Sequence, residues 1–422
     1  MSLVRFVHAA DIHLDSPLKG LEKYESAPVE RIREATRAAF KNLIAFCLEE
    51  QVDLLLISGD LFDGDLKDFK AGLFLTNQLK RLSIAGIPCV IIRGNHDAEA
   101  KMTIKIHWPD LVHELNVKNP QTIKFKALGI AVHGQGYAER DVFHDMSEAY
   151  PDPIAGMFNI GLLHTALQGR DGHAPYAPTS VEKLRLKGYD YWALGHVHKR
   201  EVVETNPYII FPGNIQGRHA KEIGPKGATL VAIEDNQVES VTEHFLDVVR
   251  WDHCRVDLAE ACNESEVYNA IRKTIGESEE RAEGRLLACR LTLLGATELH
   301  ADIVSRQEEW AYGIRAEITD SDGDIWIEKI RFKTQAKVDI EQLRAQDNPL
   351  GGVLRTLQQL QTGNDSRTDL LDCLTTINGK LPPRYKQWAD ALNLEDPAQL
   401  EELLTAIEQS IIPQLLQDVG ES

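Results

Sequence analysis

The chain has 422 residues, of which 43% are hydrophobic, so it can bury at least one large core and is expected to form two or three domains. Its net charge of −19 is unusual for an enzyme of nucleic acids, because phosphate binding normally rests on clustered Lys and Arg. The acid excess is uneven: residues 1–249 carry 27 basic and 33 acidic side chains, whereas residues 250–422 carry 19 and 32. Total charge therefore does not exclude a nucleic-acid partner for the N-terminal part.

The N-terminal segment MSLVRFVHAADIHL has neither the basic start nor the long apolar stretch of a secretory signal. No stretch approaches the ~18 apolar residues of a membrane span, so we expect a cytoplasmic protein with no membrane partner. The six cysteines form no CxxC pair, which favours free thiols over disulfides or a cysteine-bound metal.

The first hundred residues alternate short apolar runs with segments of helical period. The runs 4–9, 54–57 and 89–92 are too short for helices and are followed by polar or glycine residues, as is typical of buried strands. Between them, apolar residues recur at helical spacing: Ile32, Ala35, Ala39, Leu43 and Phe46, then Phe74, Leu75, Leu79 and Leu82. Strands that alternate with helices indicate parallel βαβ units.

Further strand-like runs follow with shorter connections, at 130–133, 160–163, 191–194, 208–211 and 228–233. They predict either one large mixed sheet or two sheets packed together, flanked by helices. We assign this α/β part to a first domain of residues 1–248.

The sequence pattern changes near residue 250 and again near residue 347. The segment 260–285 predicts a helix, and the segments 286–294, 313–318 and 325–332 predict strands, so residues 249–341 are expected to form a small α/β domain. Asn348 and Pro349 resemble an N-cap and a first helical residue. Two apolar stripes then predict helices at about 348–361 and 398–417, in a helical segment of residues 342–422: Leu350, Val353, Leu354, Leu357 and Leu360, then Leu400, Leu403, Leu404, Ile407, Ile411 and Leu415.

Five short polar clusters contain side chains that can bind metal, and four of them begin where a strand-like run ends. They are Asp11-Ile12-His13, Gly59-Asp60, Gly94-Asn95-His96-Asp97, His164, and Gly195-His196-Val197-His198. Ligand sites in open α/β sheets lie beyond the carboxyl ends of the strands, so these clusters can converge on one point. Carboxylate and imidazole together suit a borderline divalent transition metal, whereas magnesium or calcium would favour mostly oxygen ligands.

Each cluster alone also has an ordinary structural explanation. Asp and His are common turn residues after a strand, and a single histidine such as His164 is more often a core residue than a ligand. The pair His196 and His198 is more specific, because one intervening residue puts both on the same side of an extended chain. The conjunction of all five clusters in this order is the specific signal.

Taken together, the clusters resemble the pattern of the calcineurin-like metallophosphoesterase superfamily, D-x-H, GD, GNH[DE], H and GH-x-H, which is complete between residues 4 and 220. The segments HAADIHLDSP, ISGDLFD and GNHD, with the additional C-terminal domain, resemble the bacterial SbcD and YhaO type of DNA repair exonuclease. The resemblance implies two packed mixed sheets flanked by helices, a small α/β capping domain, and a helical C-terminal segment.

Carried over by motif position, the resemblance implies two divalent metal ions, with Mn²⁺ as the expected metal. Asp11, His13 and His198 would hold the first ion. Asn95, His164 and His196 would hold the second, and Asp60 would bridge the two. Such a pair lowers the pKa of a bound water for attack on phosphorus. His96 would act as general acid or transition-state stabiliser, with Asp97 orienting its ring.

Five further polar residues near these motifs lie outside this set. Archaeal and eukaryotic relatives carry a histidine three residues after the bridging aspartate, where this chain has Asp63, so we assign Asp63 no catalytic role. His8 and His133 lie inside apolar runs and are expected in the core or behind the ligands. Arg218 and His219 follow the last cluster by one strand, where contact with substrate phosphate and an ordinary polar loop are both open.

The resemblance also implies DNA as the substrate, a nucleotide with a 5′-phosphate as the product, and an SMC-like ATPase with a long coiled coil as the partner, and it allows a homodimer. Two alternatives stay open. A phosphatase or nucleotide phosphodiesterase could use the same dimetal core, although the protein-phosphatase pattern GD-x-x-DRG is not met. A non-catalytic scaffold would be expected to have lost ligands, and none of the seven is missing. The C-terminal helices could equally dock on the partner or pack within the chain.

Overall fold

The computed structural model describes residues 3–16, 28–63, 69–99, 106–167, 176–319, 323–337, 343–362 and 405–406. The chain divides into two compact units. The first comprises residues 1–253, 278–290 and 324–328, and the second comprises 254–277, 291–323 and 329–422. Within the described residues, no helix is both long enough and apolar enough to cross a membrane.

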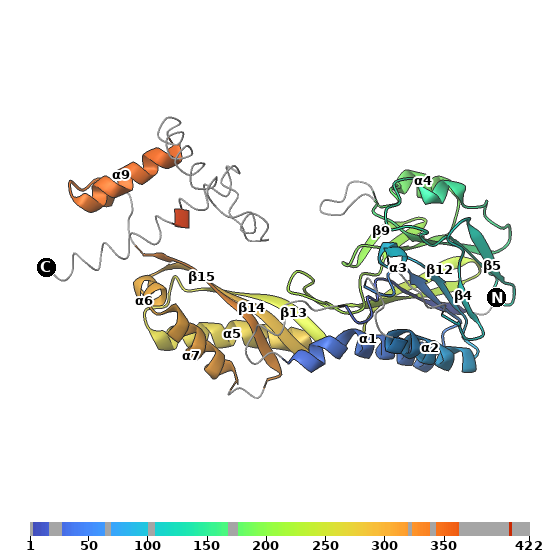
Figure 1. Ribbon diagram of the computed structural model, residues 1–422, viewed down its shortest axis with the longest axis horizontal. Coiled ribbons are helices and arrows are strands. Elements are labelled where there is room, and N and C mark those ends of the chain that lie inside the picture. The colour runs from blue at the N-terminus through green and yellow to red at the C-terminus, as the bar shows by residue number, and fades with distance from the viewer. Residues whose placement is uncertain are drawn as a thin grey trace. The chain divides into compact units, whose positions relative to one another are not determined.

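Two six-stranded mixed sheets form the first unit, so of the two arrangements left open the packed pair is the one found (Figure 1). In the first sheet, three strands run parallel to β1 in sequence order and two antiparallel strands extend its other edge. The order across this sheet is β12 (Gln237–Phe245), β11 (Gly227–Glu234), β1 (Val4–Ala9), β2 (Leu54–Ser58), β3 (Cys89–Ile92) and β4 (Val112–Glu114).

The second sheet has four parallel strands at its centre and an antiparallel strand at each edge. Its order is β5 (Gln121–Phe125), β6 (Ile130–Gly134), β7 (Phe158–His164), β8 (Tyr191–Gly195), β10 (Tyr208–Phe211) and β9 (Glu201–Thr205). All eight strands predicted in the N-terminal part are present. The other four strands of these two sheets, β4, β5, β9 and β12, were not predicted.

One hydrophobic core lies between the two sheets and others lie on their outer faces. The central core includes Phe6 and Leu56 from the first sheet and Ile160, Leu162 and Tyr191 from the second. Helices α1 (Val29–Glu49) and α2 (Phe69–Ile84) cover the outer face of the first sheet, as Figure 1 shows, with the predicted apolar stripe of α1 turned inward. The 3₁₀ helix η2 (Met146–Ala149) and α4 (Val181–Leu186) contribute to the core outside the second sheet.

His8 and His133 are buried core residues, as expected. His8 contacts the Tyr191 hydroxyl at 3.1 Å through Nδ1 and the Leu194 carbonyl oxygen at 3.1 Å through Nε2. The five cysteines in the described residues are free thiols, and all but Cys262 are buried.

The strands β13 (Val249–Asp257), β14 (Leu286–Thr297) and β15 (Ile325–Ala336) form a third sheet in that order, accompanied by helices α5 (Glu264–Ala282), α6 (His300–Ser305) and α7 (Gln307–Thr319). The strand predicted at 313–318 is wrong, because these residues lie in α7. Their apolar side chains alternate as in a strand, but Ile314 and Ile318 are also four residues apart, and the buried Trp310 extends that helical spacing.

Helix α9 (Pro349–Thr362) begins where the sequence predicted it. The Asn348 side-chain oxygen accepts a hydrogen bond from the Gly351 backbone N–H at 2.7 Å, which is the capping contact expected of that position. Leu350, Leu354 and Leu357 are buried, so most of this apolar stripe is not open surface in the single chain. The second C-terminal helix, predicted at 398–417, lies outside the described residues except for 405–406.

Candidate metal centre

The five polar clusters lie at the carboxyl ends of strands from both sheets of the first unit. Asp11 follows β1 and Asp60 follows β2, and these strands are parallel neighbours. His164 ends β7 and His196 follows its parallel neighbour β8. Two contacts connect the sheets at this edge: His164 Nδ1 donates to the Ser58 carbonyl oxygen at 2.8 Å, and the His196 backbone N–H donates to Asp11 Oδ1 at 3.1 Å. The fold therefore brings the clusters to one place.

The backbone around the clusters adopts conformations that are unfavourable for most residues. Asp11, His13, Asp60 and His196 have positive φ angles of 51°, 45°, 52° and 102°. Such strain in non-glycine residues is retained where the surrounding structure fixes it, and it concentrates at functional sites. Gly94 is required by close approach, since a Cβ atom there would lie 2.2 Å from Asp60 Oδ1.

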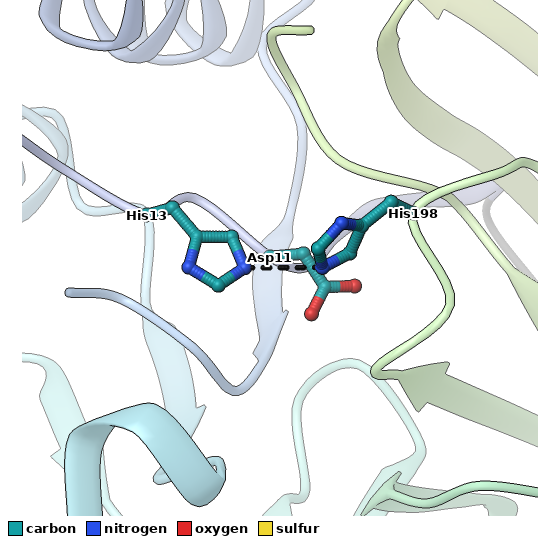
Figure 2. Close-up of side chains that lie close together, drawn as sticks. All are labelled: Asp11, His13 and His198. Atoms are coloured by element: carbon teal, nitrogen blue, oxygen red, sulfur yellow. Dashed lines mark hydrogen bonds between the residues drawn. The ribbon is translucent and has the colours of Figure 1, made fainter. Parts of the chain in front are cut away.

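Asp11, His13 and His198 form a group whose possible ligand atoms all lie within 4.8 Å of one another. Figure 2 shows the two imidazole rings facing each other, with His13 Nε2 and His198 Nε2 separated by 3.1 Å. His198 Nδ1 donates to Glu222 Oε1 at 2.7 Å, which leaves the Nε2 lone pair directed at the group. Two nitrogen lone pairs at this separation repel unless a cation or proton lies between them, and a metal ion would satisfy both.

Asp60 lies between the two halves of the cluster. Its Oδ2 atom is 3.8 Å from His13 Nε2 on one side and 3.4 Å from His164 Nε2 on the other. His164 Nε2 is also 3.0 Å from Asn95 Oδ1, and the His164 and His196 ring centroids are 5.2 Å apart. All seven predicted ligands thus lie together, with Asp60 between His13 and His164. The assignment of each ligand to an ion stays a prediction.

The half of the cluster around Asp60 and His164 stabilises charge although it is buried. Burial by itself lowers the pKa of His164, but Asp60 and Asp11 outweigh it and raise that pKa to about 9. Burial by itself raises the pKa of Asp60, but His164 and His13 lower it below its ordinary value. Buried carboxylate, amide and imidazole donors in this combination fit two divalent cations of the borderline type.

His96 lies beside the cluster and is partly open to solvent, with 33% of its side chain exposed. Its Nδ1 donates to Asp63 Oδ1 at 2.9 Å, and this hydrogen bond raises the pKa of His96 despite partial burial. The role predicted for Asp97 is wrong, because its carboxylate instead accepts the backbone N–H groups of Leu61, Phe62 and Gly94 at 2.9 to 3.1 Å. Asp63, to which no role was assigned, is the residue that orients the His96 ring.

Glu222 is the residue that sequence reasoning missed entirely. It is buried, accepts from His198 Nδ1, and also pairs with Arg218 Nη2 at 3.0 Å. Arg218 reaches Asp63 Oδ2 at 3.2 Å through Nη1, so its charge is paired with carboxylates on both sides and its side chain is only 12% exposed. This position does not favour the substrate-phosphate contact considered for Arg218. His219 is more open, with 56% of its side chain exposed.

Two packed mixed sheets that carry a buried Asp, Asn and His cluster at the carboxyl ends of parallel strands have the architecture of metallophosphoesterases. Residues 4–200 match the family "Calcineurin-like phosphoesterase". Residues 251–335 match the family "Metallophosphoesterase YhaO, middle domain". The "uncharacterized metallophosphoesterase YhaO" of Bacillus subtilis (strain 168) is 32% identical over 403 residues, which cover 94% of this chain and 95% of that protein. This chain therefore belongs to the YhaO family of calcineurin-like metallophosphoesterases, and the predicted family is confirmed.

More distant relatives include two archaeal proteins named "DNA double-strand break repair protein Mre11". The one from Methanopyrus kandleri is 25% identical over 376 residues, covering 80% of this chain and 79% of that one. The one from Sulfolobus acidocaldarius is 24% identical over 424 residues, covering 95% of this chain and 98% of that one. The similarity therefore extends beyond the phosphoesterase part.

Proposed function

We propose that this metallophosphoesterase is a DNA exonuclease or endonuclease that acts in DNA repair. The observation that carries the proposal is the hydrogen bond between His96 and Asp63 beside the seven clustered ligands, because an imidazole with a fixed orientation is suited to donate a proton to a leaving oxygen. The names of the Mre11 relatives, which match most of the chain, support DNA as the substrate.

In this proposal Asp11, His13 and His198 would hold one ion. Asn95, His164 and His196 would hold the other, and Asp60 would be shared by the two. The bound ions, Mn²⁺ by family expectation, would supply an activated water and neutralise charge on the phosphodiester. His96 donates a proton from Nε2 to the leaving oxygen, because Asp63 holds its Nδ1–H. Glu222 accepts the proton of His198 Nδ1 in a hydrogen bond and so fixes the His198 tautomer, which leaves Nε2 as the ligand atom.

The test is hydrolysis of end-labelled linear single- and double-stranded DNA by the purified full chain with Mn²⁺, Mg²⁺ or Zn²⁺. We expect slow, Mn²⁺-dependent release of nucleotides with a 5′-phosphate, and release that is at least ~10²-fold slower from the His96→Gln variant. Model phosphodiesters and nucleoside monophosphates are compared in parallel. Preference for a nucleoside monophosphate or a phosphopeptide over DNA would instead assign the site to a phosphatase or nucleotide phosphodiesterase.

Four further assignments belong to the proposal. The domain boundaries remain 1–248 for the nuclease, 249–341 for the capping domain and 342–422 for the partner-binding segment. The partner is an SMC-like ATPase with a long coiled coil, and a homodimer remains part of the hypothesis. A cytoplasmic location follows if intracellular DNA is the substrate.

A further inference from the structure

Three basic side chains alternate along β15, an edge strand of the third sheet. Lys329, Arg331 and Lys333, here called the β15 row, are exposed, whereas Ile330 and Phe332 between them are half-buried. Alternate residues of a strand face the same side and lie roughly 6.6 to 6.8 Å apart. The strand therefore presents a single row of positively charged side chains along one of its faces.

Among the described residues, no hydrogen bond or ion pair involves any side chain of the β15 row. This is notable because residues 250–422 carry 32 acidic side chains against 19 basic ones. Some other basic residues of the same unit do find partners, as in the pairs Arg272 with Glu317 at 2.5 Å and Arg306 with Asp302 at 2.5 Å, whereas exposed residues such as Lys273 do not within the described part of the chain. An acid-rich part of the chain thus leaves three neighbouring cations without a partner among the residues that the structure describes.

Protection of a sheet edge against aggregation is the simplest explanation for lysine on an edge strand. A single charge on the strand serves that purpose. Three like charges in one line also repel one another, which is unfavourable unless an anion neutralises them. The length of the β15 row therefore favours a binding role.

We propose that the β15 row binds the phosphate backbone of a nucleic acid. A nucleic-acid strand carries its negative charges in a regular line along its backbone, and an extended protein strand with a cation at every second residue can lie along such a line. A membrane surface would favour a broader face that combines basic with apolar side chains. Contacts with phosphates are independent of base sequence, as a DNA-degrading enzyme requires. The inference rests on the proposed function, since it assigns a binding surface for the same substrate.

The experiment measures fluorescence anisotropy of labelled duplex DNA with the full chain in EDTA, which prevents hydrolysis, over a range of salt concentrations. One variant combines Lys329→Gln, Arg331→Gln and Lys333→Gln. A charge-matched control combines Lys118→Gln, Lys124→Gln and Lys126→Gln, three exposed lysines of the first unit. We expect a rise in Kd of at least ~10-fold for the first variant, and a log Kd against log salt slope smaller by about 2.7, the value for three lost phosphate contacts. The control should bind as the wild type does.

Unchanged DNA affinity and salt slope in the β15 variant would overturn the inference, and so would an equal loss in the control, which would assign the effect to net charge. Loss of binding to phosphatidylserine vesicles with DNA binding intact would assign the row to a membrane and overturn it too. Both variants should hydrolyse bis(p-nitrophenyl) phosphate at the wild-type rate, which verifies folding. If the wild type cuts DNA and the β15 variant binds normally, only the surface is wrong. If the wild type neither binds nor cuts DNA, the proposed function fails with it.

Discussion

Asp63 Oδ1 accepts a hydrogen bond from His96 Nδ1 at 2.9 Å, and the same carboxylate is held by Arg218 on its other oxygen at 3.2 Å. Ser16 Oγ also donates to Asp63 Oδ2, at 2.5 Å, so donors on both oxygens fix the carboxylate and the imidazole ring it holds has one orientation. Nε2 of His96 is then the ring atom left for the substrate. This makes Asp63 a positioning residue for the proposed general acid.

The Asp63→Asn variant keeps an oxygen acceptor for His96 but loses the negative charge. The pKa of His96 should then fall, because the hydrogen bond to Asp63 is the main factor that raises it. Activity that depends on protonated His96 is lost as the pH rises through this pKa, so the alkaline limb of the kcat profile should move to lower pH. KM should change little. An unmoved alkaline limb would contradict the positioning role, and Asp152→Asn, at an exposed site, is the matched control.

Removal of the proposed acid itself should separate catalysis from metal binding. His96→Gln should lower kcat by ~10²- to 10⁴-fold, the usual contribution of general acid catalysis, and leave the metal content unchanged. Elemental analysis of the purified variant provides the measurement. The structure makes this a sharp test, because His96 also forms a group with His13 and Asp60 whose ligand atoms lie within 4.8 Å. Loss of metal from the variant would make His96 a ligand and remove its role as acid.

Replacement of the proposed bridging residue should affect both ions. Asp60→Ala should weaken binding of both metals and abolish hydrolysis, since Asp60 lies within 3.8 Å of His13 and 3.4 Å of His164. Isothermal titration with Mn²⁺ should show two weakened sites in this variant and two intact sites in Asp63→Asn. One normal site in Asp60→Ala would contradict the bridging assignment.

The ligands could be predicted from the sequence because each stands directly after a strand in a recognisable motif. Their supporting residues could not. Glu222 lies 24 residues from His198 along the chain, and β9 and β10 intervene, so only the folded chain brings the two together. Asp97 stands next to His96, which suggested that it orients that ring, but short backbone contacts with the preceding loop direct it elsewhere.

The same limit applies to the fold. Buried strands such as β2 and β3 are continuous apolar runs and could be located from composition alone. The edge strands β9 and β12 have no buried side chain and resemble loops in sequence. Segment 313–318 shows that a short alternating pattern fits a strand and a helix equally. Trp310, just before the segment, extends the helical spacing of its apolar residues and so distinguishes the two.

The C-terminal segment provides a test of the proposed partner. A chain ending at Glu341 should still fold and hydrolyse bis(p-nitrophenyl) phosphate, but it should no longer bind a purified SMC-like ATPase or show ATP-dependent DNA cleavage with it. The buried Leu350, Leu354 and Leu357 make the opposite result informative. Aggregation of the truncated protein or loss of its metals would show that the segment belongs to the core.

Glu222 should set the affinity of one metal site. Glu222→Gln keeps the side-chain shape but removes the charge that holds His198 Nδ1 at 2.7 Å and Arg218 Nη2 at 3.0 Å. Loss of such a partner typically costs 10- to 100-fold in metal affinity, roughly, or a comparable factor in activity. Mn²⁺ titration should show one weakened site and one unchanged site. Equal affinities in variant and wild type would make Glu222 a structural residue only.

His8 should make the stability of the protein depend on pH. Burial is the main factor that lowers its pKa from 6.5 to about 3, so the folded chain does not take up the proton that the unfolded chain binds below pH 6.5. The stability contributed by neutral His8 is therefore complete above pH 6.5 and is lost as the pH falls from 6.5 towards 3. Between pH 7 and pH 5 the loss is about 2 kcal/mol. Urea unfolding at these two values should show a decline that is smaller in His8→Gln than in the wild type by about this amount, and the same as the wild type in His107→Gln, which changes an exposed histidine. A parallel decline in the wild type and His8→Gln would show that other groups, and not His8, carry the pH dependence.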